Sequence, residues 1–172
     1  VITADGVNLE YEVFNKEDGE MYFNLGTHPA FMASEFPVTD YYLEFSEPET
    51  LDLYTLVGLT VAKETKPFLK NEKVIKITED LFKDDALVFK GHKSEYLSLK
   101  NINNSEEVKV SLKDFTWLGI WAPPGAPFVC LEPWCGVADM EDHNGDLTKK
   151  EAVNKLDKGG SFKRVMEIIV NK

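Results

Sequence analysis

The chain has 172 residues, a length that suits one domain with a sizeable hydrophobic core. Hydrophobic residues make up 43% of it and aromatic residues 12%, which excludes a wholly disordered chain. The net charge of −11 disfavours nucleic acid and anionic membranes as partners, because an acidic surface repels phosphate groups. No apolar run reaches the ~18–20 residues that span a bilayer.

Short apolar runs, alternating or continuous, predict a mostly β structure. In chain order, strands are expected at residues 7–13, 21–25, 41–45, 51–56, 74–77, 108–112, 118–122, 128–131 and 165–170. Helical signals are limited to one possible turn at 78–82 and a short surface helix at 146–154, with Asp146 as its N-cap. Many short strands separated by turns favour an all-β fold, a large antiparallel β-sandwich forming a single domain over residues 1–172.

The first expected strand begins almost at residue 1, so no earlier segment covers that edge of the sheet. Unpaired sheet edges are normally protected in native proteins. We therefore expect the sandwich to be incomplete at the N-terminus, and to be completed by a missing N-terminal segment or by another chain.

The two cysteines, Cys130 and Cys135, flank Pro133 and form neither a CxxC pair nor a disulfide framework. We expect buried free thiols in a reducing compartment, and no signal-peptide pattern is visible, so the predicted location is cytoplasmic. Neither cysteine has a histidine at ligand spacing, which argues against a metal site.

Residues 24–31 follow an apolar strand and contain Gly26, His28 and Pro29. The proline favours an extended backbone at His28, and a glycine turn can aim the imidazole at the sheet. A histidine can donate or accept a proton near neutral pH. The alternative is a loop histidine bonded to a carbonyl group.

Residues 128–136 place Glu132 at the end of an apolar strand, before Pro133 and Trp134. Burial raises the pKa of a carboxyl group, so Glu132 could act as a general base. The alternative is a structural glutamate that pairs with an arginine or with backbone donors.

Together these segments resemble the aldose 1-epimerase (galactose mutarotase-like) family, in particular its bacterial epimerase-like branch. The matching pieces are residues 26–31, 81–87, 118–121, 127–134, 136–139 and 155–162. The resemblance runs from about residue 7 onward and fits the C-terminal part of the family. It implies a galactose mutarotase-like supersandwich with the sugar site on a concave sheet, which interconverts the α and β anomers of an aldose or aldose phosphate without a metal or other cofactor.

The resemblance implies that Glu132 is the catalytic base, that His28 is the general acid and that Asp85 binds sugar hydroxyls, with Asp84 as an adjacent alternative. Mutarotation removes a proton from the anomeric hydroxyl and delivers one to the ring oxygen, which suits such a pair. We expect Glu132 and His28 to open into one concave pocket, about one sugar ring apart.

The tryptophans Trp117, Trp121 and Trp134 are typical core residues, although Trp121 or Trp134 could instead stack on a sugar. The family also uses an arginine and a further histidine from its N-terminal half, whereas the one arginine here is Arg164. An alternative function is therefore a non-catalytic carbohydrate-binding β-sandwich or an accessory domain of a larger carbohydrate enzyme.

Three further features are expected to be structural or solvated. His92 lies in a polar loop, His143 reads as part of a turn, and residues 47–49 resemble a solvated turn.

Overall fold

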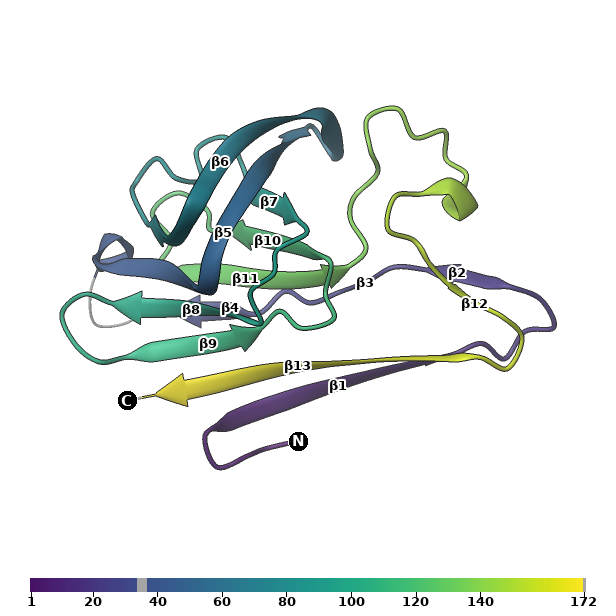
Figure 1. The fold of residues 1–172 in the computed structure, drawn as a ribbon, viewed down its shortest axis with the longest axis horizontal. Helices are drawn as coiled ribbons and strands as arrows, with labels where there is room; N and C mark the ends of the chain where they lie inside the picture. Colours follow the sequence, from purple (N-terminus) through teal and green to yellow (C-terminus); the bar gives the residue numbers. More distant parts are fainter. Residues whose placement is uncertain (34–36, 172) are drawn as a thin grey trace.

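The computed structural model describes residues 1–33 and 37–171. Nearly all of the regular structure in this part of the chain is strand (Figure 1). The strands are β1 (Gly6–Phe14), β2 (Met21–Phe23), β3 (Leu25–Gly26), β4 (Ala30–Met32), β5 (Tyr41–Val57), β6 (Thr60–Lys76), β7 (Leu87–Lys90), β8 (Tyr96–Asn101), β9 (Glu107–Ser111), β10 (Trp117–Trp121), β11 (Phe128–Cys135), β12 (Asn154–Leu156) and β13 (Ser161–Asn171). Two single 3-10 turns, η1 (Val38–Asp40) and η2 (Leu147–Lys149), accompany them.

Eleven of these strands form one antiparallel sheet in the order β1-β13-β9-β8-β5-β7-β10-β11-β3, with β4 also paired to β11 and β6 to β5. The strands β12 and β2 form a separate small sheet. In Figure 1 the long β5–β6 hairpin arches over the rest of the sheet, while β1 and β13 run together along the opposite side. The predicted all-β antiparallel fold is confirmed, although the sheet is continuous and curls on itself.

The curled sheet buries one large apolar cluster against its inner face. Alternation along β10 shows how the strand contributes, because Leu118 and Ile120 belong to this cluster while the residues between them point to the opposite face. A smaller cluster on that opposite face includes Trp117, Val61 and Val88. Strand β10 is therefore covered on both sides, which explains its continuous apolar sequence.

Most of the expected strands are present, but three predictions need correction. Residues 41–45 and 51–56 belong to a single strand, β5, which is irregular between Glu44 and Glu49. Residues 47–49 are therefore not a solvated turn, and Glu49 is only 2% exposed. The expected helix at 146–154 is reduced to η2, because Asn154–Leu156 pairs with β2 instead. The predicted N-cap is confirmed, since the Asp146 carboxylate accepts from the Thr148 backbone N–H.

The expectation for His92 was wrong, whereas that for His143 is confirmed. The His92 ring is largely buried, and its Nε2 lies 3.4 Å from the Leu112 carbonyl oxygen. His143 forms part of a turn, where its Nδ1 accepts from the Gly145 backbone N–H at 3.2 Å.

The strand β1 stands at one end of the sheet order. Within residues 1–33 and 37–171, the N-terminal residues fold back onto the start of its outer edge, where Ile2 bridges Val7 and the Asn8 N–H donates to the Val1 carbonyl at 2.7 Å. No named strand pairs with the rest of that edge, so it is open beyond Asn8, as expected. No helix in the same residues is long and apolar enough to cross a membrane.

Candidate functional site

The site is built by β3, β4 and β11, whose pairing extends through residues 27–29, the segment between β3 and β4 that holds His28. Both β3 and β4 pair with β11 in the same register, one at each end. Between them, the Thr27 backbone N–H donates to the Pro133 carbonyl at 3.2 Å, so the register is unbroken. His28 and Glu132 are consequently cross-strand neighbours, with side chains on one face of the sheet.

These two side chains are in direct contact. His28 Nε2 lies 3.4 Å from Glu132 Oε1, and the side chains are 64% and 5% exposed, respectively. Burial raises the pKa of the Glu132 carboxyl, while the nearby His28 and hydrogen bonding from Trp134 act in the opposite direction. The pair therefore combines a buried candidate base with an exposed imidazole at its rim.

The expected separation of about one sugar ring between Glu132 and His28 was wrong. Directly opposed side chains on an antiparallel pair have Cβ atoms only about 4.5–5.5 Å apart, which leaves no space for a pyranose between them. The two groups do share one face, so a sugar could lie over both of them.

The Trp134 side chain lies flat against the sheet beside Glu132. A Cβ atom added at Gly119 would come within 2.4 Å of the indole ring, and one at Gly26 within 2.9 Å. The indole N–H donates to the Thr27 carbonyl at 3.2 Å, which fixes its direction. The two glycines thus make room for a half-buried aromatic surface next to the acid–base pair.

Asp85 shares a cavity of about 200 Å³ with Trp134, whereas the adjacent Asp84 is absent from its lining. The backbone φ of Asp85 is 88°, an uncommon value for a residue with a side chain. Its carboxylate accepts from the Ala86 backbone N–H at 2.7 Å, which stabilises this turn. Of the two aspartates, Asp85 is thus the one directed to the same cavity as Trp134.

The other tryptophans differ in their surroundings. Trp121 pairs with Cys130 across β10 and β11, so it lies on the site face, and it is half-buried. Trp117 is 1% exposed and packs edge-to-face on Tyr54 with ring centroids 4.9 Å apart. The core role fits Trp117, while Trp121 and Trp134 border the Glu132–His28 pair.

A third side chain, the Cys130 thiol, also belongs to the site. A ring nitrogen of His28, the sulfur of Cys130 and a carboxylate oxygen of Glu132 all lie within 4.8 Å of one another. Burial, with a contribution from Glu132, raises the pKa of the Cys130 thiol to about 11, so it is a poor nucleophile at neutral pH. Sequence spacing missed this cluster because sheet register, not local sequence, brings His28 to the cysteine.

The one arginine of the chain lies on the other side of β11. Its Nε donates to the Asp114 carbonyl at 2.8 Å and contacts Cys135 Sγ at 3.3 Å, and Cys135 belongs to the main core. Arg164 therefore supports the fold and does not line the face that carries Glu132.

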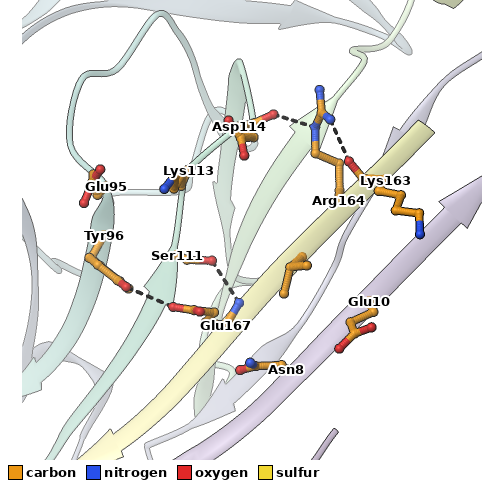
Figure 2. Close-up of a pocket in the computed structure, with 11 residues that line it drawn as sticks. Asn8, Glu10, Glu95, Tyr96, Ser111, Lys113, Asp114, Lys163, Arg164 and Glu167 are labelled. Carbon is orange, nitrogen blue, oxygen red and sulfur yellow. Dashed lines mark hydrogen bonds between the residues drawn. The ribbon is translucent and has the colours of Figure 1, made fainter. Parts of the chain in front are cut away.

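Arg164 also borders a polar cavity of about 520 Å³ between β13 and the segment from β8 to the turn after β9 (Figure 2). Tyr96 donates to Glu167 there at 2.9 Å, and Arg164 donates to the Lys163 carbonyl at 2.7 Å. Cationic and anionic side chains are mixed along this cavity, which favours no ligand of one charge.

Comparison with known proteins supports the resemblance seen in the sequence. No family model matches the chain. The plasmid and chromosomal LacX proteins of Lactococcus lactis subsp. lactis are 31% identical over 166 residues, which is 91% of this chain and 56% of theirs. A galactose mutarotase related enzyme from Lactobacillus acidophilus superposes with a TM-score of 0.89 at 28% identity, covering 99% of this chain and 59% of that one.

A galactose mutarotase-like protein from Lactobacillus casei superposes with a TM-score of 0.90 at 21% identity, covering 99% of this chain and 60% of that one. The chain has the galactose mutarotase-like fold. It spans 56–60% of the length of these relatives. The LacX proteins and the Lactobacillus acidophilus enzyme share 31% and 28% of their residues with it, respectively, in the aligned regions.

Proposed function

We propose that this chain carries the acid–base pair of an aldose 1-epimerase-like isomerase, which interconverts the α and β anomers of an aldose or aldose phosphate. The observation that carries the proposal is the buried Glu132 carboxyl in direct contact with the His28 imidazole. The relative from Lactobacillus acidophilus, described as a galactose mutarotase related enzyme, agrees with this reaction class.

In the proposed mechanism, Glu132 removes the proton of the anomeric hydroxyl while His28 delivers a proton to the ring oxygen. The ring opens, the C1–C2 bond rotates, and the reverse transfers close the ring on the other face. Proton transfer by two positioned side chains needs no metal or other cofactor. Because both groups lie on one sheet face, the sugar lies across them and not between them.

The surrounding side chains offer the remaining contacts of this proposed site. The indole of Trp134 presents an apolar surface for the C–H face of a pyranose, and Trp121 borders the pair from the other side. Asp85 would accept hydrogen bonds from sugar hydroxyls at the far end of Trp134. The buried free thiols Cys130 and Cys135 support a reducing compartment, such as the cytoplasm, within the same proposal.

The alternative is a non-catalytic carbohydrate-binding or accessory β-sandwich. The observation that favours it is that the chain matches only 56–59% of the length of its relatives. The remaining part of those proteins could supply binding or catalytic groups that this chain lacks. A binding module needs aromatic surfaces and hydrogen bonds but no acid–base pair, so turnover separates the two functions.

Polarimetry of a freshly dissolved aldose tests the proposal, both in this chain and in a longer chain that carries the family's remaining segment. Replacing Glu132 with Gln should slow the catalysed reaction by ~10²–10⁴-fold with little change in sugar affinity, because the amide keeps the shape but accepts no proton. His28→Asn should also slow it. The exposed Glu95→Gln serves as the matched control and should retain the wild-type rate.

Near-normal turnover in Glu132→Gln would assign the base to another residue. Sugar binding without turnover in the longer wild-type chain would favour the non-catalytic alternative.

A further inference from the structure

Three different metal-binding side chains meet on one face of β11. Cys130 and Glu132 are two residues apart on the strand, so both point to the same face, and His28 is the cross-strand neighbour of Glu132. The imidazole, thiol and carboxylate each bring a ligand atom to within 4.8 Å of the other two. We propose that His28, Cys130 and Glu132 form a binding site for Zn²⁺ with a fourth position open to solvent.

The spacing of these atoms suits a tetrahedral ion. Bonds of about 2.0–2.3 Å to nitrogen, oxygen and sulfur place neighbouring ligand atoms roughly 3.3–3.6 Å apart. The separation of 3.4 Å between His28 Nε2 and Glu132 Oε1 already falls in this range. Bringing the Cys130 sulfur from at most 4.8 Å requires a shift on the order of 1 Å, which is within reach of side-chain movement.

The burial of the three ligands determines how the ion enters. Cys130 and Glu132 are buried, whereas His28 is exposed and forms the rim of the site. An ion therefore enters from the His28 side and keeps its fourth position toward solvent, the arrangement of an open zinc site. The mixed nitrogen, sulfur and oxygen ligands favour Zn²⁺ or Co²⁺ over Mg²⁺ or Ca²⁺, which prefer oxygen ligands alone.

Metal binding has a consequence that rests on the proposed function. The lone pairs that coordinate the ion are those with which Glu132 and His28 would exchange protons with a sugar. Bound Zn²⁺ and anomer interconversion therefore exclude one another, so the metal is an inhibitor of the proposed reaction.

Titration of the reduced 172-residue chain with Co²⁺ tests the site without any need for turnover. A thiolate-to-cobalt charge-transfer band should appear and should disappear when Zn²⁺ displaces Co²⁺. The band should be lost in Cys130→Ser and retained in Cys135→Ser, a matched control because Cys135 lies on the core face of the same strand. His28→Asn should weaken binding by at least the ~10–100-fold that loss of a second-shell partner costs.

Circular dichroism checks that each variant is folded. If Cys130→Ser does not fold, His28→Asn provides the decisive test, because His28 is exposed and its replacement should not disturb the core. Absence of the band in the folded wild type, or its persistence in Cys130→Ser, would overturn the site. So would undiminished cobalt affinity in His28→Asn.

Polarimetry of the longer chain with and without Zn²⁺ separates the two proposals. Metal binding with no metal-free turnover removes the proposed function and leaves the metal site standing. Turnover that continues at saturating Zn²⁺ overturns the inference that the two share ligands.

Discussion

Glu49 shows how a single buried carboxylate can organise a loop. Its Oε1 accepts from the backbone N–H groups of Lys93 and Ser94 at 3.0 and 2.7 Å. These bonds replace the water that burial removes. The loop that precedes β8 is thereby drawn against the sheet, and the His92 ring is buried with it.

Burial lowers the pKa of His92, while the Leu112 carbonyl and the Glu49 carboxylate act in the opposite direction. Between this lowered pKa and the ordinary value near 6.5, the unfolded chain binds more protons at His92 than the folded one. The contribution of His92 to the free energy of unfolding is therefore complete above about pH 6.5 and is lost as the pH falls through that value.

We predict that His92→Gln removes this part of the acid sensitivity, because an amide does not titrate but can still donate to the Leu112 carbonyl. Urea unfolding at about pH 7.5 and about pH 5.5 measures it. The free energy of unfolding of the wild type should fall more than that of the variant between the two pH values. The difference should be at most about 1.4 kcal/mol per pH unit. Identical pH dependence of the two proteins would contradict the burial of a neutral imidazole.

At the scale of strands, the close contact between Trp134 and Gly119 predicts a specific cost. Gly119→Ala places a methyl group where the indole now lies, so Trp134 must move or β10 and β11 must separate. We expect a loss of ~1–3 kcal/mol in the free energy of unfolding, as for other overpacked positions. Urea unfolding followed by tryptophan fluorescence measures both the loss and the displacement of the indole.

Gly19→Ala is the matched control, because no atom lies within 4 Å of the added Cβ there. It should leave both the stability and the tryptophan emission nearly unchanged. Equal effects of the two substitutions would show that the contact at Gly119 is not tight.

The strands that could be predicted from sequence are those with a regular apolar pattern, such as β9, β10 and β13. The strand β8 was missed because polar residues, Ser98 and Asn101, occupy buried positions in it. Most of β6 was missed because it pairs on one side only, is largely exposed and contains Pro67.

The sequence analysis predicted that His28 and Glu132 lie together, but it did not predict how closely they approach. Segment chemistry and family resemblance pointed to His28 and Glu132 as an acid–base pair. Their direct contact, and the presence of Cys130 beside them, depend on the register between segments far apart in the sequence. Register of that kind follows from the packing of the whole sheet, which local patterns do not contain.

At the scale of the whole molecule, the outer edge of β1 pairs only with residues 1–3 near Asn8 and is open along the rest of the strand in the part of the chain that the structure describes. Phe14 on β1 and Val165 on the adjacent strand β13 are exposed apolar residues in this part of the sheet. The relatives contain a further part of about two fifths of their length outside the matched region. We propose that this part, or another chain, completes the sheet at β1.

Hydrogen exchange of the 172-residue chain tests this proposal. In an antiparallel edge strand, alternate N–H groups point toward the partner or away from it. We expect slow exchange for the β1 amides bonded to β13 and fast exchange for the outward amides beyond Asn8, whose N–H already bonds the Val1 carbonyl. Both sets should exchange slowly in a longer chain. Uniform protection of β1 in the short chain would mean that its edge is already closed.

The unbroken pairing of residues 25–32 with β11 also determines where related proteins can differ in length. Residues inserted between the two segments lengthen loops or hairpins and leave His28 opposite Glu132. One residue inserted within either segment would turn every side chain beyond it to the other face of the sheet. Loops between residues 32 and 128 can therefore change in length and keep His28 opposite Glu132, whereas one residue added within either paired segment would separate the two side chains.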